Sequence, residues 1–260
     1  MCPDRIRPQL LTSARAAPEG DGWLHEIKYD GYRLLCRIEH GRARLFSRPG
    51  REWTADLPSL AAAMEALGIG SGWFDGEMVA LRADGTPDFH ALPRAIAGKR
   101  GAPRLVYQVF DVLYLDGREL LGTDVLARKR LLEGLVRGRC ESARYTDHLV
   151  GSGPAFHHAA REAGLEGIVS KRVGSRYRPG VRSRDWVKVK CMHRYVFTVA
   201  GIGKDGAVLV DDDGAFVGCA WYTRRPSIGR TVHVAALQWT PGRPLRHATV
   251  VPDAAPSSAP

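Results

Sequence analysis

A short strand that runs into a tight turn is predicted for Glu26-Ile27-Lys28-Tyr29-Asp30-Gly31-Tyr32-Arg33. Alternate side chains of a strand share a face, so Glu26 and Lys28 point the same way, and Asp30 joins them if the chain stays extended. Gly31 then permits a turn that other residues resist. A lysine between two carboxylates at the end of a strand is a candidate covalent nucleophile. The same pattern is typical of a surface strand with alternating charges, and this stretch alone leaves both interpretations open.

The charge of the chain points to polyanionic partners. Its 260 residues allow one large domain or two ordinary ones, and they carry a formal net charge of +10. Such a balance favours nucleic acid above other partners. Arginine far outnumbers lysine, and alanine and glycine are abundant, so a GC-rich genome is the alternative explanation for part of this charge.

The cysteines and the hydrophobic pattern exclude several protein classes. Five cysteines are scattered without any C-x-x-C pair, so neither a zinc site nor a disulfide framework is indicated. No apolar run is long enough to span a bilayer, and the amino terminus has no signal-peptide core. A cytoplasmic protein without a membrane partner is therefore expected.

The order of predicted elements indicates an α+β protein. Residues 1–22 are expected to form an irregular lead-in, and beyond Cys191 only short strand-like runs follow, which suit a small OB-like β-barrel. The expected strands before Cys191 are Trp23–Tyr29, Tyr32–Glu39, Arg42–Ser47, Trp73–Leu81, Arg104–Tyr114, Gly167–Arg172 and Asp185–Lys190. The expected helices are Asp56–Leu67, with Asp56 as its N-cap, Asp124–Arg137 and Ser152–Gly164.

Four further stretches carry candidate chemistry. Phe74-Asp75-Gly76-Glu77 places two acids on one face of a strand, and Glu166-Gly167-Ile168-Val169-Ser170-Lys171 places an acid at a turn that leads into a strand. Tyr107-Gln108-Val109-Phe110-Asp111 is a largely apolar strand. Asp185-Trp186-Val187-Lys188-Val189-Lys190 sets two lysines on one face, where their repulsion favours a bound anion. A solvated edge strand protected by lysines is the alternative for this last stretch.

Taken in this order, the stretches resemble the motifs of the covalent nucleotidyltransferases, which include the ATP-dependent DNA ligases and their RNA-ligase and capping-enzyme relatives. These stretches are most similar to the motifs of the ligase module of bacterial end-joining DNA ligases. The matching stretches are Lys28–Arg33 (K-x-D-G-x-R), Ser47-Arg48, Phe74–Glu77, Val109–Gly117, Glu166–Lys171 and Trp186–Lys190.

The resemblance implies a fold and a domain order. An antiparallel-sheet nucleotidyltransferase (ATP-grasp-like ligase) domain would occupy residues 1–190 as the adenylation domain. A short OB-like domain would follow over residues 191–253, and residues 254–260, rich in Pro, Ser and Ala, are expected to be disordered. The chain is expected to act as a monomer in the bacterial cytoplasm, associated with the nucleoid. End-joining proteins would act in trans.

The resemblance also implies an activity. Lys28 would attack the α-phosphate of ATP, release pyrophosphate and carry AMP, which then activates the 5′-phosphate of a nicked or broken DNA strand for attack by a 3′-hydroxyl. A lysine attacks only as the neutral amine, and repulsion from Lys188, Lys190 and a divalent metal would favour that form. Asp30, as the acid of the same motif, is included with these three lysines as a catalytic residue.

The same resemblance assigns the remaining site residues. Glu166 would bind Mg²⁺ (or Mn²⁺), and Glu77 would contact the ribose and the metal. Phe110 would stack on adenine, and Glu26 would lie near the amino edge of the base. Arg33 and Arg48 would meet the ribose, the pyrophosphate or the DNA 5′-phosphate. Without the resemblance, Phe110 is by default a core residue, and Arg48 is a solvated loop tip.

A basic segment between the predicted metal and phosphate sites is the candidate DNA contact. Tyr177 lies among its arginines, which the sequence places where a DNA backbone would approach. These arginines are Arg172, Arg176, Arg178, Arg182 and Arg184. In the predicted β-module, Trp221 could face DNA together with Arg224 and Arg225, or it could belong to the core.

One departure from the family pattern leaves two hypotheses. The family's final motif, an R-x-D-K-like phrase that orients the pyrophosphate, is not found after Leu237-Gln238-Trp239-Thr240-Pro241-Gly242-Arg243. The chain is then either an active ligase that loads AMP slowly or with help, or a nucleic-acid-binding homologue that has lost turnover. The intact Lys28 and both predicted metal acids favour the active ligase. An RNA ligase or a capping-type enzyme is a further alternative.

Overall fold

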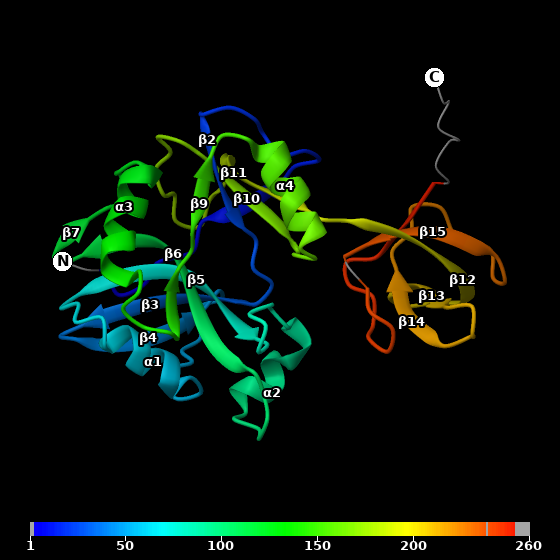
Figure 1. The fold of residues 1–260 in the computed structure, drawn as a ribbon, viewed down its shortest axis with the longest axis horizontal. Coiled ribbons are helices and arrows are strands. Elements are labelled where there is room, and N and C mark those ends of the chain that lie inside the picture. The colour runs from blue at the N-terminus through cyan, green and yellow to red at the C-terminus, as the bar shows by residue number, and fades with distance from the viewer. Residues whose placement is uncertain (1–2, 238, 253–260) are drawn as a thin grey trace. The chain divides into compact units, whose positions relative to one another are not determined.

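The computed structural model describes residues 3–237 and 239–252 and divides into two compact units (Figure 1). The first unit holds the chain up to Ala159 together with Gly167–Val189, and the second holds Ala160–Glu166 and the chain from Lys190 onward. The predicted disordered tail, residues 254–260, lies outside the described residues, as do Cys2 and Gln238. In the described part of the chain, no helix is long and apolar enough to cross a membrane.

A six-stranded sheet forms the base of the first unit. Its strands run in the order β4-β3-β5-β6-β7, and β8 pairs with β6. The β3–β4 hairpin turns at His40 and Gly41, which both have positive φ (49° and 72°), as a two-residue hairpin loop requires. The strands are β3 (Tyr32–Glu39), β4 (Arg42–Ser47), β5 (Gly72–Leu81), β6 (Arg104–Leu115), β7 (Arg118–Glu119) and β8 (Ala143–Tyr145).

Three helices cover one face of this sheet with apolar side chains. They are α1 (Pro58–Glu65), α2 (Leu92–Ile96, after the 3₁₀ turn Phe89–Ala91) and α3 (Val125–Val136), and they share one core with inward residues of β3, β5 and β6. Asp124 caps α3 by accepting a hydrogen bond from the backbone N–H of Ala127 (2.9 Å). The predicted cap of α1 was wrong, because Leu57 and not Asp56 precedes this helix, and it gives no side-chain bond.

A second sheet of five strands, in the order β1-β11-β10-β2-β9, completes the first unit. The prediction of an irregular lead-in over residues 1–22 was wrong in part, because Leu10–Ser13 forms β1 and pairs in parallel with β11. A parallel partner far along the chain leaves no local signal in the sequence. The other strands are β2 (Trp23–Ile27), β9 (His148–Val150), β10 (Gly167–Arg172) and β11 (Arg182–Lys190), and α4 is Gly153–Glu162.

The face of the six-stranded sheet opposite the helices meets this second sheet. Strand alternation sends Leu34 and Cys36 into the helix-covered core, and it sends Leu35 to a second core with Trp73 and Leu113. The same second core contains Trp186 of β11. Polar side chains on these two facing surfaces form the site described below.

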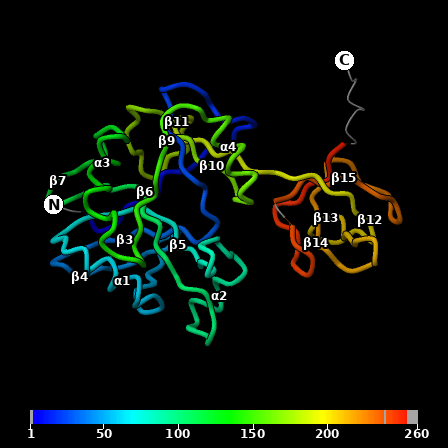
Figure 2. Tube along the Cα trace, in the orientation of Figure 1, coloured from blue at the N-terminus to red at the C-terminus, as the bar shows by residue number. Residues whose placement is uncertain are grey.

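The second unit contains a five-stranded antiparallel sheet in the order β14-β13-β12-β15-β16 (yellow to red in Figure 2). The strands are β12 (His193–Gly203), β13 (Gly206–Val210), β14 (Phe216–Ala220), β15 (Thr231–Ala236) and β16 (Thr249–Val251). Trp221, which follows β14, forms a parallel bridge to Thr249 of β16, with hydrogen bonds from its N–H to Ala248 (3.0 Å) and from Val250 to its carbonyl (2.8 Å). The bridge connects the two edges of the sheet, so the sheet closes on itself.

Candidate active site

Lys28 lies immediately after β2, where the chain leaves one sheet for the other. Its backbone N–H donates to the carbonyl of Gly167 (2.9 Å), which fixes this point of the chain against β10. The predicted strand through Tyr29 was too long, because β2 ends at Ile27, and Asp30 therefore does not continue its face. A Cβ on Gly31 would lie 2.0 Å from the carbonyl oxygen of Met78, so only glycine allows the chain to pass β5 this closely.

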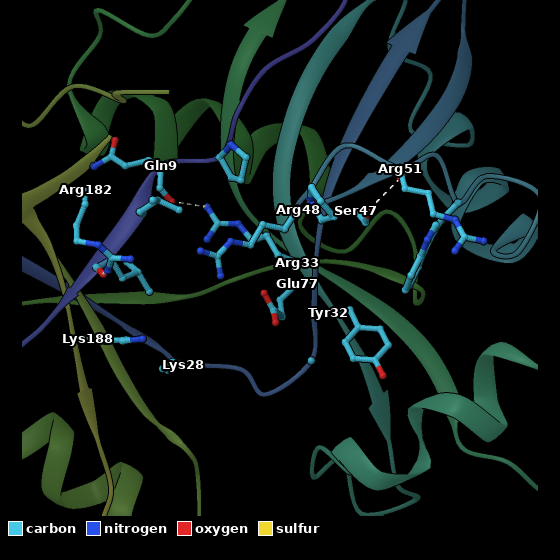
Figure 3. Close-up of a pocket in the computed structure, with 16 residues that line it drawn as sticks. Gln9, Lys28, Tyr32, Arg33, Ser47, Arg48, Arg51, Glu77, Arg182 and Lys188 are labelled. Carbon is cyan, nitrogen blue, oxygen red and sulfur yellow. Dashed lines mark hydrogen bonds between the residues drawn. The ribbon is translucent and has the colours of Figure 1, made fainter. Parts of the chain in front are cut away.

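Lys28 lines two neighbouring cavities of the first unit. The larger cavity has a volume of about 600 Å³, and Figure 3 shows Lys28 and Lys188 on one side of it and Arg51 on the other. Among the described residues that line it, Glu77 is the one carboxylate. The basic side chains of its lining are Lys28, Arg33, Arg48, Arg51, Arg182 and Lys188. Such a lining suits a polyphosphate or a nucleic-acid backbone.

The smaller cavity is mainly apolar and has a volume of about 60 Å³, room for about two water molecules. Phe110, Trp186 and Ile27 contribute apolar surface, and Glu26 and Lys171 contribute charge.

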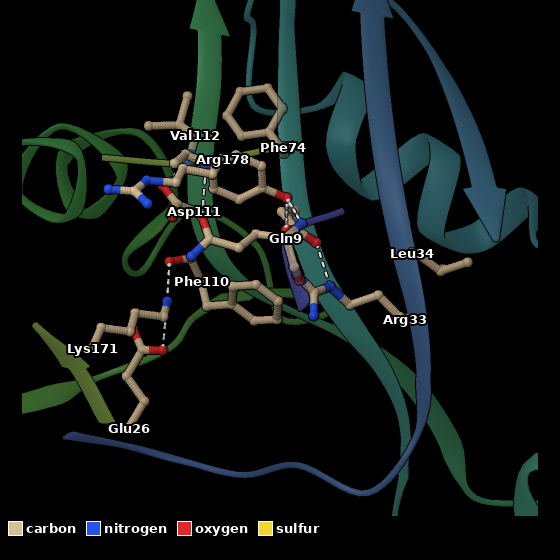
Figure 4. A network of polar contacts seen from close by, with 12 residues as sticks. Gln9, Glu26, Arg33, Leu34, Phe74, Phe110, Asp111, Val112, Lys171 and Arg178 are labelled. Atoms are coloured by element: carbon tan, nitrogen blue, oxygen red, sulfur yellow. Dashed lines mark hydrogen bonds and ion pairs between the residues drawn. The ribbon is translucent and has the colours of Figure 1, made fainter. Parts of the chain in front are cut away.

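Phe110 projects from β6 on the face that meets the second sheet, and Figure 4 shows it between Lys171 and Arg33. The guanidinium carbon of Arg33 lies 4.7 Å from the ring centroid, and the ammonium of Lys171 lies 4.8 Å from it. Both distances are typical of cation–π contacts. Two cations therefore lie over the ring that was predicted to stack on adenine.

Arg33 is held by a buried carboxylate to which the sequence had given no role. Its Nε and Nη2 each donate to Asp75, at 2.6 Å, and the Tyr177 hydroxyl donates to the same carboxylate at 2.5 Å. Burial alone would lower the pKa of Arg33, but Asp75 outweighs burial and raises it. Arg33 thus remains a cation that lines both cavities while two of its donors are committed to Asp75.

Glu26 is held in the same way, by two lysines. Its carboxylate lies 2.7 Å from the ammonium of Lys129 in α3 and 2.7 Å from that of Lys171 in β10. Burial acts to raise the pKa of Glu26, and the two lysines together outweigh burial and lower it. No pattern in the sequence distinguishes Lys129 from other lysines of a helix. Lys171 belongs to the stretch Glu166–Lys171, but no role was predicted for it.

Lys188 and Lys190 end β11 and share one face of this strand, since they are two residues apart. Lys188 lines the larger cavity, whereas Lys190 and Glu166 group with the second unit and line neither cavity. Glu166 directly precedes β10, and its carbonyl accepts a hydrogen bond from the N–H of Cys191 (2.9 Å). No cluster of three or more His, Cys, Asp or Glu side chains suited to a metal is found among the described residues.

The basic segment from Arg172, at the end of β10, to Arg184, in β11, is exposed but anchored. The arginines at positions 172, 176, 178, 182 and 184 are all exposed, and Arg182 lines the larger cavity. Asp185 lies 3.6 Å from Arg172 and 3.5 Å from Arg178. Tyr177, which the sequence grouped with the arginines, is only 2% exposed and anchors the segment through Asp75. In the second unit, Trp221 is 66% exposed, which excludes the core alternative.

Comparisons with known proteins assign the chain to a family. Residues 9–190 match the family described as "ATP dependent DNA ligase domain". The "Multifunctional non-homologous end joining protein LigD" of Pseudomonas aeruginosa is 40% identical over 200 residues, which is 76% of this chain and 24% of that protein. The "SPbeta prophage-derived DNA ligase-like protein LigB" of Bacillus subtilis is 32% identical over 185 residues, 71% of this chain and 67% of that protein.

A solved structure, "mycobacterial DNA ligase D complexed with ATP and MES", is 30% identical, with a TM-score of 0.68 over 97% of each chain. The chain spans about a quarter of the length of the LigD proteins it matches. Because the family match covers more than half of its residues, the chain belongs to the ATP-dependent DNA ligase domain family.

Proposed function

We propose that this chain is an ATP-dependent DNA ligase that joins the 5′-phosphate and 3′-hydroxyl ends of nicked or broken DNA in repair by end joining. One observation carries the proposal: Lys28 lies where a small aromatic cavity and a large cationic cavity meet. A nucleotide with its base in the first and its phosphates in the second would bring its α-phosphate to this lysine. The relatives named for end joining and DNA ligation support the choice of substrate.

The chemistry proposed for Lys28 is a nucleotidyl transfer. The neutral amine attacks the α-phosphorus of ATP, a P–N bond forms as the P–O bond to pyrophosphate breaks, and the amine loses a proton. Lys188 and Lys190 would balance the charge that develops on the α-phosphate oxygens. Asp30, two residues from Lys28, is the fourth catalytic residue of the proposal. Attack by the DNA 5′-phosphate and then by the 3′-hydroxyl would complete sealing.

The nucleotide contacts follow from the linings of the two cavities. Phe110 would stack on adenine and Glu26 would face its amino group, while Arg33, Arg48 and Glu77 would contact ribose and phosphates. The position of Arg48 in the larger cavity supports a phosphate contact over a solvated loop tip.

We propose Mg²⁺ (or Mn²⁺) as a cofactor. Mg²⁺ is usually held by one or two carboxylates together with substrate phosphates, and it needs no cage of protein ligands. Glu77, the one carboxylate among the described residues of the larger lining, would be one ligand, and Glu166 is proposed as the other. When bound, the ion would offset phosphate charge.

DNA would contact the exposed arginines from the end of β10 to the start of β11. Arg182 supports this placement, because it is both exposed and part of the lining that contains Lys28. The other members of this proposed contact are Arg172, Arg176, Arg178 and Arg184, with Arg48 from the larger cavity. A DNA substrate would associate the protein with the bacterial nucleoid.

We further infer a division of labour between two domains. Residues 1–190 would form the adenylation domain, and residues 191–253 would form a short OB-like domain. The five antiparallel strands and the bridge from Trp221 to Thr249 support a small closed barrel. Monomeric action, with other end-joining proteins supplied in trans, completes the proposal.

Covalent labelling tests the proposal directly. The protein is incubated with α-labelled ATP and Mg²⁺ or Mn²⁺, and a label that survives denaturation is expected on the wild type and not on Lys28→Ala. Sealing of a nicked duplex should require the same lysine. Absence of label with every metal, together with retained DNA binding, would support the alternative of a ligase homologue with impaired self-adenylylation.

Two further assays separate the remaining alternatives. Sealing of a nick that already carries AMP on its 5′-phosphate tests whether only the first step is slow. Labelling by GTP in preference to ATP, or sealing of RNA in preference to DNA, would indicate a capping-type enzyme or an RNA ligase.

A further inference from the structure

Arg128 in α3 is a fully buried arginine that lines neither of the two cavities at Lys28. Its Nε and Nη2 donate to the two carboxylate oxygens of Asp111, at 2.7 and 3.0 Å. A buried ion pair is costly to desolvate, and well-packed apolar residues of similar volume often serve stability as well or better. The pair with Asp111 alone therefore does not explain why an arginine is buried here.

The remaining nitrogen of Arg128 contacts the basic segment. Nη1 donates to the carbonyl of Ser175 (3.4 Å) and to that of Thr123, and the guanidinium carbon lies 5.9 Å from the ring centroid of Tyr177. Ser175 and Tyr177 are buried residues of the basic segment. Only an arginine serves both tasks, because the ammonium of a lysine lacks the planar fork that reaches Asp111 and Ser175 at the same time.

Residues 175–178 of the basic segment belong to no strand, yet contacts with the rest of the first unit hold them in place. The N–H of Tyr177 donates to the carbonyl of Leu121 (3.0 Å), and the N–H of Arg178 donates to Oε1 of Gln9 (2.6 Å). Backbone groups outside a sheet need such partners where water does not reach them. Together with the bond from α3, these contacts fix one path for the chain.

This path turns the arginines outward. Side chains alternate along residues 175–178, so that Ser175 and Tyr177 are buried while Arg176 and Arg178 are exposed. If the segment were free, DNA would have to order its backbone and its long side chains on binding, and this ordering lowers affinity. A fixed path removes that cost before DNA arrives.

We propose that Arg128 is a positioning residue that holds the basic segment in its DNA-contacting conformation in the free protein, so that DNA meets a preformed surface of arginines. The proposal rests on the proposed function, because it takes the basic segment as a contact with the DNA backbone. It adds a buried residue of α3 that acts on DNA only through Ser175. Affinity for DNA then depends on the interior of the protein as well as on its exposed charge.

Hydrogen exchange in the wild-type protein tests the preformed path, so that the folding of a variant is not in question. Without DNA, the amides of Tyr177 and Arg178 should exchange at least about 100-fold more slowly than in an unstructured peptide, because both already donate hydrogen bonds. A nicked duplex should change these rates little. Exchange at the rate of an unstructured peptide, which becomes slow only when DNA is added, would overturn the proposal.

Arg128→Lys separates the two tasks of the arginine, because a lysine keeps a cation beside Asp111 but leaves Ser175 without its donor. The amides of residues 175–178 should then exchange about tenfold faster, and affinity for a nicked duplex should fall about tenfold. The salt slope should stay unchanged, because the same phosphates are contacted once DNA is bound. Arg130→Lys, at an exposed position of the same helix, is the matched control and should change none of these quantities.

Three results with Arg128→Lys would overturn the positioning role. Exchange that is faster by the same factor in β3 as in the basic segment would mean that the variant loosens the whole first unit, which is a merely structural effect. Wild-type affinity for the nicked duplex would mean that DNA binding does not depend on this arginine. A salt slope lowered by about one would mean that a phosphate contact, and not a conformation, was lost.

The exchange experiment also separates this inference from the proposed function, because it is made without DNA. If the segment exchanges freely in the free protein but Arg176→Ala/Arg184→Ala lowers the salt slope, the DNA contact stands and only the preformed path is wrong. If the segment is protected but that pair leaves the slope unchanged, the proposed DNA contact itself fails, and the positioning role fails with it.

Discussion

Arg33 and Asp75 form a buried bidentate ion pair, in which two guanidinium nitrogens each lie 2.6 Å from a carboxylate oxygen. The Tyr177 hydroxyl donates to the same carboxylate at 2.5 Å, and the backbone N–H of Gln9 donates to this hydroxyl at 2.9 Å. Through Tyr177, Asp75 links Gln9, which precedes β1, and the basic segment to Arg33 in β3. The Asp75 carboxylate is thus the shared acceptor of Arg33 and Tyr177.

Asp75→Asn should therefore destabilise the protein strongly. The neutral amide leaves the buried Arg33 guanidinium without its counter-charge, and loss of one partner of a buried pair costs about 3–5 kcal/mol. Urea unfolding measures the free energy of unfolding. Asp56→Asn, at an exposed position, is the control and should stay within about 0.5 kcal/mol of the wild type. A loss below about 1 kcal/mol in Asp75→Asn would show that Arg33 finds another partner.

Gly31→Ala should disturb both stability and the position of Lys28. The added Cβ would lie 2.0 Å from the carbonyl oxygen of Met78, and a backbone atom in a central strand cannot move aside as a flexible side chain can. Overpacking of this kind costs about 1–3 kcal/mol or more. The measurements are the urea midpoint and the rate of covalent labelling, and both should fall.

Gly22→Ala provides the control for this change. A Cβ at Gly22 meets no atom within 4 Å, so the same substitution there should leave the midpoint and the labelling rate near those of the wild type. If the two variants have the same urea midpoint and the same labelling rate, the backbone at Gly31 has room for a Cβ beside Met78.

The sequence predicted the elements whose signals are local. Alternation and turn residues placed β3, β4 and β10 with the bounds that the structure has, and the Asp124 cap of α3 was confirmed. These features depend on residues a few positions apart, which a strand or cap pattern records directly. The stretches around Lys28, Phe110 and Lys188 were likewise found from short sequence patterns. The fold brings these three residues to two adjoining cavities.

What the sequence could not reveal depends on partners far along the chain. Strand β1 exists because β11 pairs with it, and no pattern within residues 1–22 records this. Lys129 looks like an ordinary helical lysine until α3 packs against β6 and β8 and the side chain reaches Glu26. Asp75 stood on the predicted face, but its partners Arg33 and Tyr177 come from two other segments.

Arg176 and Arg184 test the predicted DNA contact of the basic segment. Each phosphate contact that is removed lowers the dependence of log affinity on log salt by about one. Arg176→Ala/Arg184→Ala should therefore weaken binding to a nicked duplex and lower the salt slope by about two, as measured by fluorescence anisotropy over a range of salt concentrations. The exposed Arg118→Ala/Arg100→Ala pair is the matched control. An unchanged slope in the first pair would place the DNA elsewhere.

His25 should make stability fall in mildly acidic solution. Its ring is fully buried beside Phe156, with Nδ1 2.8 Å from the Ser170 hydroxyl, and burial lowers the pKa of His25 below its usual 6.5. Below about pH 6.5, His25 is therefore protonated more in the unfolded chain than in the folded chain. The free energy of unfolding then decreases as the pH falls. A single such histidine changes the free energy of unfolding by at most about 1.4 kcal/mol per pH unit below about pH 6.5, and it has no effect at higher pH.

His25→Gln isolates this contribution, because an amide still offers Ser170 a hydrogen-bond partner but does not titrate. The difference in free energy of unfolding between about pH 7.5 and pH 5.5, taken from urea titrations, should be smaller in this variant than in the wild type. Burial lowers the pKa of His148 and His193 as well, so part of the difference should remain. His90→Gln, at an exposed position, is the control. If His25→Gln retains the full difference, the proton is taken up elsewhere, and the buried imidazole is not what makes the fold sensitive to acid.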